Sequence, residues 1–309
     1  DQTSFFSGKI NKSSRETVLI YVGNELFGGS RIDEIASAIK LARADVVGIQ
    51  EDCSSKSNVI LNELGHGWYR AGKVYSKFPA ELLYSNKDRS LEIVDVKLAG
   101  SRVVRIVNCH WWPNNYGPFL AQKKLRGDPK VNLNNLAKLV KEKGARKGGT
   151  RGYKATIDSL EEAIDEKRAI FLVGDFNEPS HLDWTEHYAE KGPDRWVDNP
   201  TGTPLRLPVQ WPGSVLLENI GMVDSFRQAH DDEVKKPGNT WTPPYPERTP
   251  GRRPYCDQVL DRIDRIYHHG KNVKVVSAQV VGEKGDTSDI VIKGRWPSDH
   301  RAVVVEYKW

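Results

Sequence analysis

Short apolar runs that stop at polar residues recur along the chain. Each has the length and the flanking turn residues of a β-strand, and the clearest cover residues 16–23, 45–49, 169–173, 273–281 and 302–307. Further strands are predicted at residues 81–84, 91–98 and 102–108. These three follow one another without an intervening helix, so we expect them to pair antiparallel.

Apolar residues at helical spacing lie between several of these strands. Ile32, Ile35 and Ile39 mark a helix that should begin with a capping box of Ser30 and Asp33 and end near residue 43. Further helices are predicted at residues 59–64, 156–167, 181–190 and 214–219. Residues 235–254 are dense in proline and are predicted as a loop.

Polar side chains follow most of the strands at the point where each strand ends. Asn24 and Glu51 follow the first two strands, and His110 follows a later one. Asp175 and Asn177 follow the strand that stops at a glycine; two residues apart on an extended segment, they should point the same way. Since ligands bind at strand ends in open α/β sheets, these residues are candidates for a site.

Each candidate also has a purely structural explanation. Asp175 could open a loop through an Asx turn, and Glu51 could be an ordinary charged residue at a strand end. His110 could pack against the two tryptophans that follow it, Trp111 and Trp112. The pooled set, rather than any single residue, favours a functional site.

The C-terminal third adds a further carboxylate and a histidine. Asp264 lies in an alternating strand at residues 260–267, on the face opposite Ile263, and a carboxylate inside a core strand needs a polar partner. Asp299 and His300 precede the last strand. Asp264 is therefore a candidate to orient a histidine.

The chemistry of the pooled residues points to a hard cation and to hydrolysis. Carboxylates and amides without a cysteine ligand suit Mg²⁺ rather than zinc. A carboxylate that activates water, an amide that holds it and a His paired with an Asp suit hydrolysis at an anionic centre.

Length and composition limit these interpretations. The chain has 309 residues, of which 38% are hydrophobic and 28% charged, which suits one large domain or two small ones. No apolar run approaches the ~18 residues that a membrane span needs. The chain opens at Asp1 and its one Met is Met222, so we expect that the first residues were processed off or left out, and we favour export to a secreted or periplasmic location.

Three cysteines, Cys53, Cys109 and Cys256, are too few and too scattered for a disulfide framework or a zinc cluster. Cys53 and Cys256 both follow polar, turn-like stretches and could pair. Free thiols are the favoured expectation.

Positive charge is concentrated in one segment. Between Gly117 and Lys154 eleven basic residues face two acidic ones, an excess of 11 − 2 = +9 against +5 for the whole chain. This basic insertion, at about residues 114–155, could be a solvated surface segment or an electrostatic collar for a polyanion or phosphorylated substrate.

The ordered set of motifs resembles the endonuclease/exonuclease/phosphatase superfamily, whose founding fold is that of pancreatic deoxyribonuclease. The resemblance runs from about Val18 to Glu306. It implies a single α/β domain, a four-layer sandwich of two mixed β-sheets packed face to face with helices outside. The motifs, in the family's order, are Asn24, Gln50-Glu51, Asn108-Cys109-His110, Gly174-Asp175-Phe176-Asn177, Arg262-Ile263-Asp264 and Ser298-Asp299-His300.

The resemblance also implies a role for each residue in a Mg²⁺-dependent attack of water on a phosphate ester. Glu51 would be the main metal carboxylate, with Asn24 and Asp299 near the metal. Asp175 would orient or deprotonate the water, and Asn177 would position it or a phosphate oxygen. His300, held by Asp264 in the donor tautomer, would donate to the phosphate, and His110 would contact it from the other side.

Two positions depart from the family's pattern. Gly23 stands where many members have Trp, and Leu26 stands where some nucleases have an acidic residue. The metal would then have fewer carboxylates, which puts a second strong metal site in doubt.

Fold does not determine substrate, so several functions stay open. We expect a Mg²⁺-dependent phosphodiesterase or phosphatase, with Mn²⁺ or Ca²⁺ as alternative ions, that acts as a monomer on a phosphate ester. A DNA or RNA endonuclease is the alternative within enzymes, so nucleic acid is a candidate partner. A non-catalytic binding module on the same fold is the alternative of another class.

Overall fold

The structure is a computed structural model that describes residues 17–24, 31–52, 57–87, 90–114, 116–128, 153–164, 168–244 and 253–309. Its strands are β1 Thr17–Asn24, β2 Val46–Gln50, β3 Tyr69–Ala71, β4 Val74–Ser76, β5 Ala80–Asn86, β6 Leu91–Lys97, β7 Val103–His110, β8 Ile170–Asp175, β9 Val223–Asp224, β10 Asp264–His269, β11 Lys274–Gly282, β12 Ile290–Val291 and β13 Ala302–Lys308. Its α-helices are α1 Ile32–Leu41, α2 Ser57–Leu64, α3 Gly117–Leu125, α5 Tyr153–Ile164, α6 Glu186–Lys191, α7 Pro212–Asn219 and α8 Ser225–Ala229. Short 3-10 helices lie at Ala99–Ser101 and Tyr255–Asp257.

The strands form two mixed sheets. The first has the order β12-β11-β13-β1-β2-β4-β3, and the second has the order β5-β6-β7-β8-β10-β9. Within them β1 and β2 run parallel, as do β7 and β8, whereas β5, β6 and β7 pair antiparallel as the sequence predicts.

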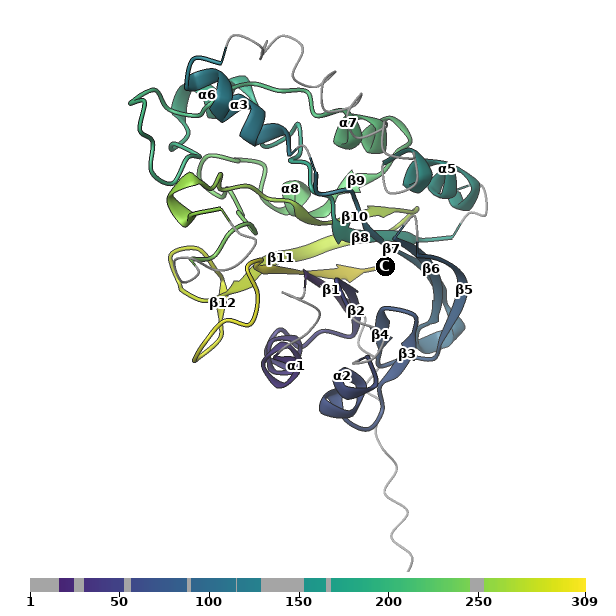
Figure 1. The fold of residues 1–309 in the computed structure, drawn as a ribbon. Helices are drawn as coiled ribbons and strands as arrows, with labels where there is room; N and C mark the ends of the chain where they lie inside the picture. Colours follow the sequence, from purple (N-terminus) through teal and green to yellow (C-terminus); the bar gives the residue numbers. More distant parts are fainter. Residues whose placement is uncertain are drawn as a thin grey trace, which may run out of the picture.

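Helices cover the outer face of each sheet, so the molecule has four layers (Figure 1). Ile35 and Ile39 of α1 pack on the outer face of the first sheet, and Ile157 and Leu160 of α5 pack on the outer face of the second. Between the sheets lies a core of mostly β-branched residues from both, among them Ile20, Val46, Val104, Ile106, Val173 and Val305. The predicted four-layer sandwich is confirmed.

Two helices begin later than the sequence predicts. Arg31, not Ser30, is the N-cap of α1, and no side chain caps it. The helix predicted at residues 181–190 begins only at Glu186, after Thr185 accepts a hydrogen bond from the Tyr188 N–H. Before it, the His181 N–H is held by Ser214 Oγ at 2.8 Å.

The first part of the basic insertion is a packed helix that the sequence reading missed. Leu120 and Ala121 of α3 are buried against the tryptophans of a satellite core, Trp184, Trp196 and Trp211. Arg126, just after α3, forms an ion pair with Asp257 at 2.6 Å. Most of the remaining basic residues of the insertion lie between 129 and 152, outside the described residues.

Two further expectations concern thiols and membranes. Cys109, which is buried, and Cys256, which is exposed, have free thiols, and Cys53 lies outside the described residues. Within the described part of the chain, every helix is too short or too polar to cross a lipid bilayer.

One buried histidine makes the fold sensitive to acid. His268 of β10 shares a hydrogen bond with Ser225 Oγ at 2.9 Å, and Tyr307 donates to the same oxygen at 2.5 Å. Burial lowers the pKa of His268 to about 4, so the ring is neutral in the folded protein. The unfolded chain therefore binds more protons than the folded chain between about pH 4 and the ordinary histidine pKa of about 6.5.

We expect the contribution of His268 to stability to be complete above about pH 6.5 and to be lost as the pH falls to about 4. The free energy of unfolding should fall by up to about 1.4 kcal/mol per pH unit in this window. Urea titrations of the protein and of His268→Gln at pH 4.5 and 7.5 measure this, with exposed His66→Gln as the control. An equal pH dependence in all three proteins would contradict it.

Candidate active site

The second sheet brings three of the predicted residues into one row. His110 ends β7 and lies opposite Asp175, which ends the parallel strand β8. Asp264 begins β10 and lies opposite Asp175 from the other side, because β10 runs antiparallel to β8. The three side chains form a row because each of these strands has a polar residue at this edge of the sheet.

The first sheet supplies the other side of the site. Asn24 ends β1 and is paired in register with Gln50, which ends β2 and precedes Glu51. Asp299 and His300 come just before β13, the antiparallel neighbour of β1. The backbone of Asn24 is described, but its side chain is not.

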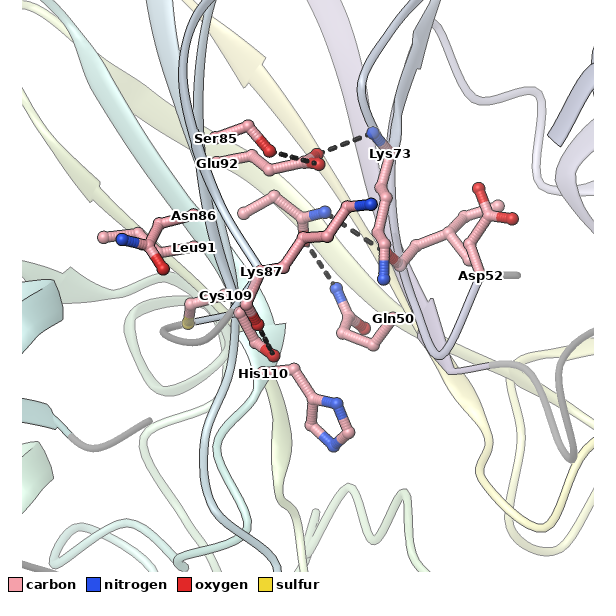
Figure 2. Close-up of a pocket in the computed structure, with 13 residues that line it drawn as sticks. Gln50, Asp52, Lys73, Ser85, Asn86, Lys87, Leu91, Glu92, Cys109 and His110 are labelled. Carbon is pink, nitrogen blue, oxygen red and sulfur yellow. Dashed lines mark hydrogen bonds between the residues drawn. The ribbon is translucent and has the colours of Figure 1, made fainter. Parts of the chain in front are cut away.

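A direct contact between the sheets fixes the distance between the two halves of the site. Gln50 Nε2 donates to Asn108 Oδ1 at 2.7 Å, and Asn108 Nδ2 donates to the Ile49 carbonyl at 3.1 Å (Figure 2). A Cβ at Gly48 would lie 2.4 Å from Val173 Cγ2, so a side chain there would push the sheets apart. The sequence motif containing Asn108 was recognised, but its bond to Gln50 was not predicted.

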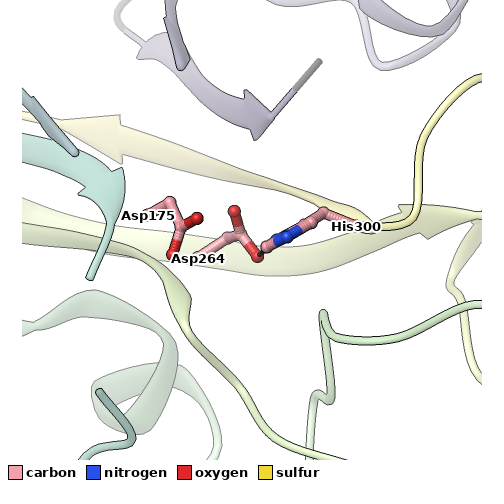
Figure 3. A group of neighbouring side chains, drawn as sticks. All are labelled: Asp175, Asp264 and His300. Atoms are coloured by element: carbon pink, nitrogen blue, oxygen red, sulfur yellow. Dashed lines mark hydrogen bonds and ion pairs between the residues drawn. The ribbon is translucent and has the colours of Figure 1, made fainter. Parts of the chain in front are cut away.

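His300 and Asp264 form the predicted pair. His300 Nδ1 lies 2.9 Å from Asp264 Oδ2, and ligand atoms of Asp175, Asp264 and His300 all lie within 4.8 Å of one another (Figure 3). Burial lowers the pKa of His300, but the carboxylates of Asp264 and Asp175 outweigh it and raise that pKa to about 10. The imidazole is therefore charged near neutral pH, and both of its nitrogens are donors.

Asp175 is ionised between two histidines. Its Oδ2 lies 3.4 Å from His110 Nε2. Burial alone would raise the pKa of Asp175, but the charge of His300 and the hydrogen bond and charge of His110 lower it overall. A buried carboxylate that stays charged in this way can accept a proton or a hydrogen bond from water.

The expectation of an extended segment from Asp175 to Asn177 is wrong. Asn177 has a φ of 45°, in the left-handed region that asparagine tolerates better than most residues. Its N–H donates to Asp175 Oδ1 at 2.9 Å, and its Nδ2 donates to the Trp111 carbonyl at 3.1 Å. The structural alternative, an Asx turn, is thus present, and it holds the Asp175 carboxylate in a fixed orientation.

Glu51 lies among the other charged groups of the site. It is half-buried and has a φ of 58°, a left-handed conformation that glutamate rarely adopts. Burial raises the pKa of Glu51. The charges of His110 and His300 lower this pKa, and the charges of Asp175 and Asp299 raise it. Glu51 and Asp299 therefore interact with the Asp175–Asp264–His300 group across the two sheets.

The donor set fits a hard divalent cation. A positive charge beside Glu51 would offset the burial of its carboxylate and the repulsion from Asp175 and Asp299. His300 is a poor ligand, because its Nδ1 faces Asp264 and its ring carries a proton. Carboxylate oxygens are therefore the groups on the described part of the site that could hold such an ion.

The proline-rich loop has a role at the site that the sequence did not reveal. Thr242 Oγ1 donates to the Asp299 carbonyl at 2.8 Å, and the Arg301 N–H donates to the Thr240 carbonyl at 2.6 Å. The ring of Trp241 lies 6.3 Å from that of His300. The tryptophan in the loop was visible in the sequence, but nothing there indicated which segment it contacts.

Comparisons with known proteins agree with this geometry. A model of the Endonuclease/Exonuclease/phosphatase family matches residues 24–300, from the first to the last predicted site residue. The Caenorhabditis elegans protein "Uncharacterized protein F14F9.5" is 26% identical over 289 residues, which cover 89% of this chain and 84% of that protein.

Two solved structures share the fold. The endonuclease/exonuclease/phosphatase from Beutenbergia cavernae has a TM-score of 0.52 and 16% identity, over 95% of this chain and 72% of that chain. TDP2 from D. rerio, complexed with a single strand DNA product, has a TM-score of 0.51 and 15% identity, over 95% of this chain and 99% of that chain. The sheets, the strand-end residues and the match to the family model lead to one conclusion: the chain belongs to the endonuclease/exonuclease/phosphatase family.

Proposed function

We propose that the protein is a divalent-metal-dependent hydrolase of phosphate esters, a phosphodiesterase or phosphatase. The observation that carries the proposal is the geometry of His300, which is hydrogen-bonded to Asp264 at 2.9 Å and lies beside Asp175. The two carboxylates raise the pKa of His300, and the histidines lower that of Asp175. A donor and an acceptor close together at one end of two sheets are what attack of water on phosphorus requires.

The residues divide the reaction between them. Asp175 accepts a hydrogen bond or the proton of the attacking water. Asn177, fixed by its bond to Trp111, contacts the water or a phosphate oxygen with its remaining polar atoms. His300 donates from Nε2 to a phosphate oxygen and stabilises the charge that develops there, and His110 contacts the phosphate from the side of β7.

Glu51 would hold the metal, with Asn24 and Asp299 near it. Mg²⁺ is the proposed ion, because the available donors are carboxylate and amide oxygens; Mn²⁺ and Ca²⁺ accept the same ligands. When bound, such an ion supplies Lewis-acid stabilisation of negative charge on the phosphate.

A nucleic-acid substrate is the second candidate. The basic insertion carries an excess of nine positive charges directly after the strand that ends at His110. D. rerio TDP2, which shares the fold, binds a single strand DNA product. We place a small phosphate ester first and an endonuclease activity second.

The first prediction concerns the metal carboxylate. Glu51→Gln should lower kcat/KM by at least about 10²-fold, because metal-ion stabilisation of the transition state is worth several kcal/mol, while thermal unfolding changes little. Hydrolysis of bis(4-nitrophenyl) phosphate with Mg²⁺ or Mn²⁺ measures it, and EDTA should abolish the activity. Glu81→Gln, an exposed carboxylate on β5, is the control. Near-normal turnover of Glu51→Gln at saturating metal would refute the assignment.

The second prediction concerns the His300–Asp264 pair. Asp264→Asn and His300→Ala should each lower kcat by about 10²–10⁴-fold, the range for positioned acid–base groups. Because the two residues act as a unit, the double variant should lose little more than the worse single variant. Steady-state kinetics of the four proteins test this, and losses that multiply would show that the residues act independently.

The third prediction separates the two substrate classes. A polymer that contacts several lysines and arginines should bind with a slope of log K against log salt of about −0.7 to −0.9 per phosphate contacted. We expect the slope of log K against log salt to be shallower than about −3. Replacement of Lys143, Arg146, Lys147 and Arg151 by Ser should change the hydrolysis of a small diester little. A steeper slope, with plasmid cleaved in preference to the small diester, would favour the endonuclease.

A further inference from the structure

A cavity of about 400 Å³ opens beside the candidate active site and has no role in the mechanism above. It lies between the two sheets, where β2 and the turn between β3 and β4 face β5, β6 and the end of β7 (Figure 2). We call it the Lys73/Lys87 cavity; its polar lining includes Gln50, Asp52, Lys73, Asn86, Lys87 and Glu92.

The cavity is continuous with the site through His110. This residue borders the cavity, its imidazole points away from Lys73 and Glu92 in Figure 2, and its Nε2 lies 3.4 Å from Asp175 Oδ2. Gln50, another lining residue, directly precedes Glu51. A substrate whose reacting phosphorus lies near Asp175 can therefore extend past His110 into the cavity.

Two lysines give the cavity available positive charge. Lys73 comes from the turn between β3 and β4, and Lys87 follows the end of β5. Within the described ranges, neither ammonium group has a hydrogen bond or an ion pair. Each can therefore bind an anion without first breaking a contact seen here.

The two carboxylates of the lining are already engaged. Glu92 Oε2 accepts the Lys73 N–H at 2.6 Å, and Oε1 accepts from Ser85 Oγ at 3.3 Å. Burial raises the pKa of Glu92, whereas the hydrogen bond and the charge of Lys73 lower it. Asp52 accepts from the Tyr75 hydroxyl at 3.0 Å, and its carboxylate points away from the other lining side chains in Figure 2.

The turn that carries Lys73 is built to approach Glu92 closely. Gly72 has a φ of 62°, and a Cβ there would lie 2.5 Å from Glu92 Oε2. Glycine at this position therefore allows the contact that fixes the backbone of Lys73 at the edge of the cavity. Leu91 and Ile49 also border the cavity, but their side chains pack in the cores on the outer faces of the second and first sheets.

We propose that the Lys73/Lys87 cavity binds a second phosphate group of the substrate, so that the protein prefers phosphate esters with an additional phosphate. Lysine ammonium groups suit phosphate as point charges. The inference rests on the proposed function, since it takes the first phosphate to bind near Asp175. The second phosphate comes from a polynucleotide or from a polyphosphorylated small molecule.

Calorimetric binding to the full chain with Mg²⁺ tests the cavity separately from turnover. The probes are two pairs, thymidine monophosphate with thymidine bisphosphate and glucose monophosphate with glucose bisphosphate. We expect at least one bisphosphate to bind about tenfold or more tightly than its monophosphate, as for one added charge-assisted contact. Lys73→Met and Lys87→Met should remove this preference and leave monophosphate binding unchanged, whereas Lys97→Met, an exposed lysine at the other end of β6, should keep it.

The outcomes separate the two proposals. Equal binding of mono- and bisphosphates, or a preference that survives both lysine substitutions, would overturn the second-phosphate subsite. Absence of bis(4-nitrophenyl) phosphate hydrolysis with any divalent ion would overturn the proposed function, while the calorimetric comparison still decides the subsite. A preference limited to the nucleotide pair identifies a polynucleotide as the source of the phosphate, and a preference in both pairs identifies a small molecule.

Discussion

Asn108 joins the two sheets next to the candidate site through hydrogen bonds with the Gln50 side chain and the Ile49 carbonyl, and the site depends on them. Glu51 and His300 come from the first sheet, whereas Asp175, Asp264 and His110 come from the second. Each sheet supplies a histidine and at least one carboxylate, but the group of Asp175, Asp264 and His300 forms only where the two sheets meet. Because Gly48 has no side chain, the two sheets approach each other closely at this point. The polar residues at the strand ends of both sheets therefore lie in one site.

Charge alternates across this constellation. The Asp264 carboxylate pairs with the His300 imidazolium, which faces Asp175, and Asp175 in turn contacts His110. Each buried charge is thereby stabilised by a neighbour of opposite sign, which a low-dielectric interior requires. Burial raises the pKa of both Asp264 and Glu51, but only Asp264 has a histidine within hydrogen-bond distance among the contacts described above.

Much of this arrangement could be predicted because strand ends are encoded locally. The ends of the apolar runs show that Asn24, Glu51, His110 and Asp175 lie at strand ends. The order of the motifs along the chain indicates the fold. The Asx turn at Asp175 is an alternative that the sequence itself offers. The bond from Asn177 to the Trp111 carbonyl and the missed helix α3 could not be predicted, because they depend on residues distant in the sequence. The loop at Thr240 and Thr242 bonds to residues about sixty positions further on, and no local pattern indicates such a contact.

The position of β13 has a consequence for biosynthesis. This last strand lies between β11 and β1 in the first sheet, so the earliest strand of the chain pairs with the latest. During synthesis, β1 cannot pair with β13 until the ribosome has released the residues of β13. Contacts between residues so distant in the sequence form slowly. His300 enters the site in the same step. Until β13 has been released, the edge of β1 that it covers stays unpaired and the site lacks His300.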